Sequence, residues 1–125
     1  MITGAQTKIP AIGLSAPNSV FVRKTFHPPI TVDDLNKYTF NIVPIGDFVP
    51  TIDSLAENYQ HIKCRAPANR KLSECHSERR SLCEILKTCG SDKRRPIPCF
   101  CVNEYGYDEP TSVTGKKFVD YCPKI

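Results

Sequence analysis

The sequence predicts a protein of the α/β class, and three observations carry that expectation. Residues 38–43 combine aromatic and β-branched side chains in the manner of a buried strand. Shorter runs at residues 9–14 and 59–64, the first apolar and the second alternating, predict two further strands. Residues 77–89 place apolar side chains at helical spacing, which predicts an amphipathic helix after the last strand.

The first third of the chain is expected to hold short elements separated by breaks. Residues 1–8 are short and polar and are predicted as the end of a helix, before the strand at residues 9–14. Residues 20–31 contain a Pro-Pro pair and are expected to be irregular. Residues 32–37 predict one helical turn, with Thr31 as its N-terminal cap.

The strand at residues 38–43 ends abruptly and delivers a carboxylate to its C-terminal edge. Pro44 and Gly46 break the strand, and Asp47 follows at once. Functional sites of open α/β sheets lie outside the carboxyl ends of the strands. Asp47 is therefore the first candidate for a functional residue, ahead of a loop predicted at residues 48–52.

The second half of the chain is expected to combine the last strand, one helix and cysteine-held loops. Residues 66–74 predict a loop between the strand and the helix. Ser77 is placed to cap the helix at residues 77–89. The predicted apolar face of that helix consists of Leu82, Cys83, Leu86 and Cys89. Loops alone are predicted for residues 91–125.

Composition narrows the class of protein. The chain has 125 residues, of which 40% are hydrophobic and 24% charged, which suits one small domain or part of a larger one and excludes a disordered chain. The net charge of +4 is mild. The basic cluster at residues 93–95, beside Arg79 and Arg80 on the predicted helix, is too small for a nucleic-acid surface. We expect no nucleic-acid partner, no transmembrane segment and no cofactor.

Seven cysteines crowd the second half of the chain: Cys64, Cys75, Cys83, Cys89, Cys99, Cys101 and Cys122. Such density predicts disulfides and an oxidising compartment, hence a secreted or lumenal protein. Their pairing cannot be derived from the sequence, and the odd count leaves one thiol free or paired outside the chain. Residues 1–8 hold no apolar core of signal-peptide length, so the native N-terminus is expected to lie upstream.

A zinc site is the alternative use of these cysteines, since cysteine and histidine are common zinc ligands. The candidate ligands are Cys75, His76, Cys83, Cys89, Cys99 and Cys101. The chain has no C-x-x-C pair, however, and Cys99 and Cys101 make a poor chelating pair. Disulfides are therefore preferred, and no metal site is predicted.

Three stretches of the chain, residues 7–17, 33–35 and 38–52, together carry a family likeness. The most specific part is the run Gly-Asp-Phe-Val-Pro at residues 46–50. With these motifs the chain resembles the C-terminal part of class 3 lipases, the fungal-lipase-like α/β-hydrolases. The cysteine spacing of residues 75–90 resembles a cysteine-rich branch of that family.

The resemblance implies a partial α/β-hydrolase: the last strands and helices of the sheet at residues 1–90, and a cysteine-containing tail packed on them at residues 91–125. In that family a Ser-His-Asp triad hydrolyses acylglycerols or related esters, and lipid is the substrate of the complete enzyme. Asp47 would be the acid and His76 the general base, in the chain order of α/β-hydrolases. The chain has no G-x-S-x-G motif for the nucleophile, so a fragment inactive by itself, with possible contact to a lipid surface, is implied.

Other residues compete for these roles. Asp53 is the rival acid, and His61, within a predicted strand, is the rival base. His27 stands beside two prolines and is expected at the surface. Ser15 lies in a Gly-Leu-Ser-Ala-Pro stretch that imitates a nucleophile elbow, but proline replaces the second glycine that lets strand and helix approach closely.

A function of a different class is the alternative to the hydrolase. A small secreted, disulfide-rich binding module without catalysis would account for the cysteine density and for the unmatched tail. It would not account for the Asp signature at the strand end. A signal peptide directly upstream would favour the binding module, and an upstream G-x-S-x-G would favour the hydrolase.

Overall fold

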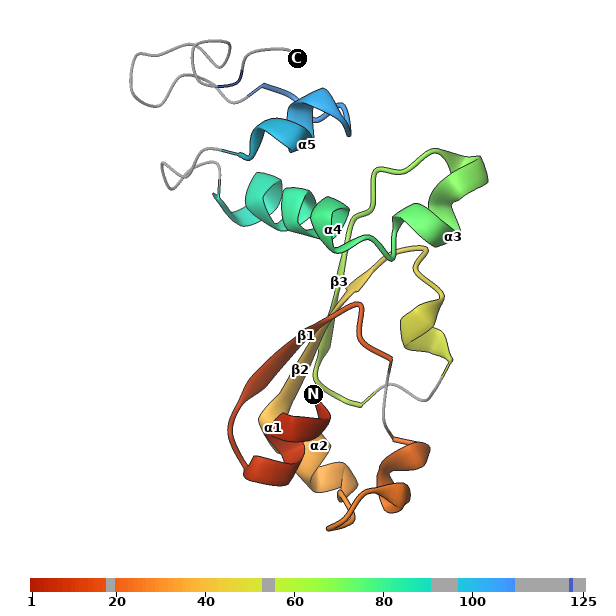
Figure 1. Ribbon diagram of the computed structural model, residues 1–125, viewed down its shortest axis with the longest axis vertical. Coiled ribbons are helices and arrows are strands. Elements are labelled where there is room, and N and C mark those ends of the chain that lie inside the picture. Colours follow the sequence, from red (N-terminus) through yellow and green to blue (C-terminus); the bar gives the residue numbers. More distant parts are fainter. Residues whose placement is uncertain (18–19, 53–55, 91–96, 110–121, 123–125) are drawn as a thin grey trace.

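Three parallel strands form the centre of the protein in a computed structural model (Figure 1). They lie in the order β1 (Ala11–Leu14), β2 (Thr39–Pro44) and β3 (Tyr59–Ile62). The structure describes residues 1–17, 20–52, 56–90, 97–109 and 122. All three predicted strands are present, with ends that differ from the predicted ones by one or two residues.

The parallel arrangement brings the C-terminal ends of the strands to one edge. Thr39 lies opposite Ala11, and Asn41 lies opposite Tyr59. Parallel neighbours need a crossover connection, and α2 (Val32–Tyr38) lies in the one that joins β1 to β2. Asp47, shortly after β2, is therefore at the edge where the sequence placed it.

Two short helices cover one end of the sheet. α1 (Ile2–Thr7) and α2 pack side by side at the lower end in Figure 1. Their core with the neighbouring loops consists of Ala5, Ile30, Leu35 and Ala56. The predicted cap of α2 is confirmed, because the Thr31 hydroxyl oxygen accepts the backbone N–H of Asp34 at 3.0 Å.

A buried amide holds the chain just beyond β1. Asn41, in the middle strand, is 1% exposed. Its side-chain amide donates to the carbonyl of Ala16 at 2.9 Å, and its side-chain carbonyl accepts the Ala16 N–H at 3.3 Å. Because these buried polar groups are paired, Asn41 ties the end of β1 to β2 at little cost.

Pro44 ends the middle strand without losing a ladder hydrogen bond. The N–H groups of Asn41 and Ile45 donate toward β3. Position 44, which lies between them in the alternation, therefore faces β1, and β1 has already ended at Leu14, opposite Ile42. Proline has no N–H to donate, and no acceptor waits for one at this position.

The segment after β3 contains helices where a loop was predicted. The expectation for residues 66–74 is wrong, because the 3₁₀ turn η3 (Ala68–Arg70) leads directly into α3 (Lys71–Glu74). Two other 3₁₀ turns occur in stretches expected to be irregular or loop: η1 (Val22–Thr25) and η2 (Val49–Thr51). Short 3₁₀ turns carry little sequence signal, since they are connectors rather than propensity-driven helices.

The predicted long helix is present in two parts. α4 (Glu78–Ile85) begins after Ser77 as expected, although no side-chain cap bond forms there, and it continues into the π-helical turn Leu86–Gly90. The tail, predicted as loops alone, contains α5 (Cys99–Asn103), which packs on α4. Figure 1 shows α4 and α5 beyond the end of the sheet opposite to α1 and α2.

α4 buries polar side chains, so the apolar face predicted for it is wrong in part. Arg80, Ser81, Cys83 and Glu84 are buried, whereas Leu82 is 41% exposed. Helical spacing identifies residues that share a face, but the covering segment decides which face is buried. Here the cover is the cystine- and aromatic-rich tail.

Arginine–aromatic contacts hold that tail on α4. The guanidinium carbons of Arg79 and Arg80 lie 4.3 and 4.4 Å from the ring centroids of Phe100 and Tyr105. Both distances are within the range of cation–π attraction. These two arginines are therefore packing residues, and the cluster predicted at residues 93–95 lies outside the described residues.

A buried polar cluster lies beside these contacts. The Glu84 carboxylate is 1% exposed and pairs with Arg65, whose Nε lies 3.4 Å from Oε1. The Arg65 guanidinium also lies 5.3 Å from the ring centroid of Tyr107. Burial raises the pKa of the Tyr107 hydroxyl above its ordinary value, and the neighbouring Glu84 carboxylate raises it further. The tail thus docks through polar groups as well as through cystines.

The architecture is mixed α/β, as predicted, while its identity as part of an α/β-hydrolase remains a prediction. Within the described residues, β1 and β3 each pair with one strand only. Ile12 and Phe40, register partners on one face, are 73% and 36% exposed. Parallel sheets are normally covered on both faces, so this face has room for a further layer.

Candidate active site

The backbone after β2 holds Asp47 in a fixed position. Gly46 adopts a φ of 99°, and the Asp47 N–H donates to the carbonyl of Pro44 at 3.1 Å, which closes the turn. The Asp47 side chain is fully buried. Its Oδ1 accepts the backbone N–H of Val49 at 2.9 Å, which leaves Oδ2 for a second partner.

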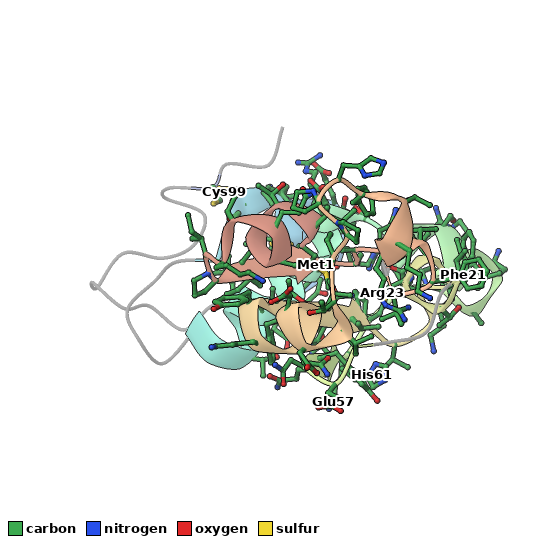
Figure 2. All side chains as sticks on the ribbon, turned by 90° about the horizontal axis from the view of Figure 1, so that it is seen from below. Met1, Phe21, Arg23, Glu57, His61 and Cys99 are labelled. Carbon is green, nitrogen blue, oxygen red and sulfur yellow. A yellow bond between two sulfur atoms is a disulfide. The ribbon has the colours of Figure 1, made fainter. Side chains whose placement is uncertain are left out.

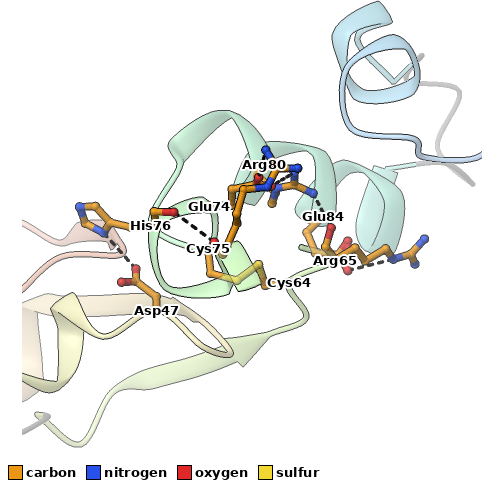
Figure 3. Close-up of a disulfide and its surroundings, with 10 residues drawn as sticks. Asp47, Cys64, Arg65, Glu74, Cys75, His76, Arg80 and Glu84 are labelled. Carbon is orange, nitrogen blue, oxygen red and sulfur yellow. Dashed lines mark hydrogen bonds and ion pairs between the residues drawn. A yellow bond between two sulfur atoms is a disulfide. The ribbon is translucent and has the colours of Figure 1, made fainter. Parts of the chain in front are cut away.

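That second partner is His76, which lies between α3 and α4. Its Nδ1 is 3.1 Å from Oδ2 of Asp47 (Figure 3). An ionised carboxylate can only accept, so we assign the proton of the neutral imidazole to Nδ1. The sequence separates these residues by 29 positions, and the fold brings them together as the resemblance implied.

The geometry leaves the reactive side of the imidazole available. The His76 side chain is 46% exposed, and in Figure 3 its second ring nitrogen points away from Asp47. With Nδ1–H held by a buried carboxylate, Nε2 is a proton acceptor that faces outward. This is the arrangement of an acid–base pair in which the carboxylate sets the tautomer and stabilises the imidazolium.

The rival histidines lie elsewhere. Nδ1 of His61 is 3.3 Å from the carbonyl of Val43, and the Tyr59 ring meets the imidazole edge-on at 5.3 Å. Figure 2, seen from below, shows His61 at the periphery of the molecule. His27 is exposed, as predicted. The rival acid, at position 53, lies outside the described residues.

Ser15 has an unusual backbone but no partner for catalysis. It follows β1 at the same sheet edge as Asp47, with a φ of 52° and an N–H that donates to Ile42 at 2.9 Å. The residue is 2% exposed, and its hydroxyl is buried without a hydrogen bond. Among the described residues, no hydroxyl or thiol bonds to the His76 ring, so the site lacks its nucleophile in this part of the chain.

Disulfides account for six of the cysteines. The pairs are Cys64–Cys75, Cys83–Cys101 and Cys99–Cys122. Four ligands of the zinc alternative are therefore oxidised and cannot act as thiolates. The described residues contain no group of three or more His, Cys, Asp or Glu side chains suited to a metal ion. Three disulfides are compatible with an extracellular or lumenal protein.

Sequence reasoning missed the groups that support His76. Glu74, two residues before it, pairs with Arg80 and with Arg70, the latter at 3.0 Å. Arg80 is 5% exposed and also donates to the carbonyl of Arg65. The separation of six residues between Glu74 and Arg80 is not a helical pairing distance, so no local pattern revealed this contact.

Comparisons with known proteins identify no relative: no protein-family model matches the chain, and neither a curated protein nor a solved structure is detectably similar to it. In the part of the chain that the structure describes, no helix has the length and apolarity needed to cross a membrane. The argument for function therefore rests on the site.

Proposed function

We propose that this chain carries the acid and the general base of a serine ester hydrolase of the class 3 lipase type. The contact between His76 Nδ1 and the buried Oδ2 of Asp47, at 3.1 Å, is the observation that supports the proposal. The nucleophile would come from a G-x-S-x-G segment, which these 125 residues do not contain. The substrates would be triacylglycerols or other carboxylic esters, and the compartment secreted or lumenal.

The proposed roles follow from the hydrogen-bond geometry. A serine hydroxyl attacks the ester carbonyl while Nε2 of His76 accepts its proton, and the imidazolium then returns that proton to the leaving alcohol. Asp47 orients the ring and stabilises its positive charge without taking up the proton. The oxyanion donors, like the serine, would belong to the segment that carries the elbow.

The edge of the sheet supports the same proposal. β1 has an unpaired side within the described residues, and the adjoining face exposes Ile12. A strand that leads into a nucleophile elbow would pair there, and its helix would cover apolar surface. Asp47 and His76 already lie at the C-terminal edge at which such an elbow would end.

The test uses the complete product of the native transcript. The transcript is read upstream of Met1, and the encoded protein is assayed with short-chain esters and with a fluorophosphonate that labels activated serines. We expect an in-frame G-x-S-x-G, labelling, and a kcat lowered about 10⁴-fold by Asp47→Asn. His76→Ala should lower kcat at least as far, and His61→Gln, the matched control, should leave it unchanged.

Two results would contradict the proposal. One is hydrolysis that survives His76→Ala, and the other is a transcript without the serine motif. A signal peptide directly upstream of Met1 would instead favour a disulfide-rich binding module, for which the three disulfides are the supporting observation. The 125-residue chain alone should hydrolyse no ester above background in either case.

A further inference from the structure

The segment that carries His76 is closed by its own disulfide. We call residues 63–77, from the end of β3 to the start of α4, the histidine loop. Cys64, near its start, bonds Cys75, eleven residues on, with the Cα atoms 5.7 Å apart. Cys75 is fully buried and precedes His76 directly. The cystine thus fixes the peptide unit from which the imidazole extends (Figure 3).

The base depends on this closure more than the acid does. Asp47 is held by a turn at the end of the central strand and by the N–H of Val49. His76 lies in the short connection between α3 and α4, outside both helices. Its recorded side-chain contact is the one with Asp47, so its position is set by the residues on either side of it.

A guanidinium repeats the same cross-link. Arg80, on α4, donates to the carbonyl of Arg65, the residue after Cys64. Its other terminal nitrogen pairs with the carboxylate of Glu74, the residue before Cys75. Arg80 is 5% exposed, so both bonds lie in a desolvated site where they are strong. The two ends of the histidine loop are therefore joined twice, once by sulfur and once by Arg80.

We infer that the Cys64–Cys75 disulfide and Arg80 are the positioning groups that hold His76 on Asp47, an inference that rests on the proposed acid–base role of the pair. The disulfide fixes the distance between the ends of the histidine loop, and Arg80 fixes their orientation. Neither touches the reacting atoms. Without them the imidazole swings away from the carboxylate and loses the Nδ1–H tautomer that leaves Nε2 free to accept a proton.

The experiment reads the tautomer directly and needs no catalysis. The ¹⁵N-labelled chain is studied by long-range ¹H–¹⁵N spectra at a pH where histidines are neutral, and His76→Gln identifies the His76 signals among the three histidines. The unaltered chain should show one His76 species, protonated at Nδ1. Cys64→Ser/Cys75→Ser should lose that single species and show the mixture of tautomers typical of a free imidazole.

Two further variants make the test specific. Cys83→Ser/Cys101→Ser removes a disulfide of similar geometry, with Cα atoms 5.5 Å apart, that joins α4 to α5, and should keep the Nδ1–H species. Arg80→Lys keeps the Cys64–Cys75 bond, but one ammonium cannot reproduce the two-sided guanidinium contact, so it should shift part of the population. If the double serine variant loses its dispersed backbone spectrum, Arg80→Lys decides the question alone.

The failures of the two ideas are distinguishable. A single Nδ1–H species that persists in the Cys64→Ser/Cys75→Ser and Arg80→Lys variants overturns the positioning role and leaves the acid–base pair intact. Equal loss in the Cys83→Ser/Cys101→Ser control also overturns it, since the effect would then be general loosening. Absence of the Nδ1–H species in the unaltered chain refutes the proposed function itself.

Discussion

Gly46 is the residue at which a single added methyl group should disturb both the fold and the site. It precedes Asp47 and has a φ of 99°, a conformation that residues with a side chain rarely adopt. A Cβ at this position would lie 2.6 Å from Cε and 2.9 Å from Cγ of Lys71. Gly46→Ala therefore combines backbone strain with a clash against the histidine loop.

The magnitude follows from these two contributions. Placing an L-residue at such a φ costs about 1–3 kcal/mol. The clash adds about 1 kcal/mol, the low end of overpacking costs, because a lysine stem can move aside. The lower chain entropy of alanine in the unfolded state recovers about 0.5 kcal/mol. We expect Gly46→Ala to lower the free energy of unfolding by about 2–3 kcal/mol.

Urea denaturation of the oxidised chain measures this change as a shift in midpoint at constant slope. Gly106→Ala is the matched control, because Gly106 has a φ of 68° and a Cβ there would meet nothing within 4 Å. That variant should lose about 1 kcal/mol or less. Lys71→Ala in the Gly46→Ala background should recover the steric part, about 1 kcal/mol, and leave the backbone part.

Two outcomes would refute this reasoning. If Gly46→Ala costs no more than Gly106→Ala, the close approach of Lys71 has no energetic weight. If Lys71→Ala recovers the whole loss, the φ of Gly46 is not a constraint. The tautomer of His76 in Gly46→Ala reports whether the strain also reaches the site.

Three further predictions concern single residues. Ser15→Gly should raise the free energy of unfolding by about 1 kcal/mol, since it relieves a φ of 52° and removes a buried hydroxyl without a partner; Ser15→Ala, which keeps the strain, should gain less in the same urea assay. Because burial, reinforced by Glu84, raises the pKa of Tyr107 above 10.0, its contribution to stability is complete below pH 10 and is lost as the pH rises further; Tyr107→Phe should flatten that alkaline decline in urea midpoints. The hydrogen bond from Lys8, with a second from Thr31, lowers the pKa of Asp34 below 3.8, so its contribution is present above that pH and is lost as the pH falls through the lowered value; in thermal unfolding, Asp34→Asn should lack this acid-side loss.

Local signals in the sequence predicted the elements whose causes are local. The Thr31 cap forms because its hydroxyl lies three residues from the N–H that needs an acceptor. The strand at residues 39–44 forms where β-branched and aromatic residues end at proline, and the turn after it needs the glycine at position 46. The candidacy of Asp47 followed from its place after that strand.

The sequence failed where burial depends on a distant partner. Nothing near Arg80 indicates that a charged residue will be buried, because its acceptors come from Arg65 and Glu74 on the far side of a disulfide. The exposure of Leu82 likewise depends on where the tail docks. α5, in that tail, is a five-residue helix with a disulfide at its first and third positions, and its cystines stabilise it more than its propensity does.

The sequence by itself determined the class of the fold, the strand that leads to Asp47, and the presence of disulfides, because periodicity, turn residues and cysteine density act over a few neighbouring positions. Only the tertiary structure decided that His76, rather than His61, meets Asp47, and which cysteines pair. Those outcomes depend on contacts between segments far apart in the chain, which form only when the sheet brings the ends of its strands to one edge and the Cys64–Cys75 bond returns the histidine loop to that edge.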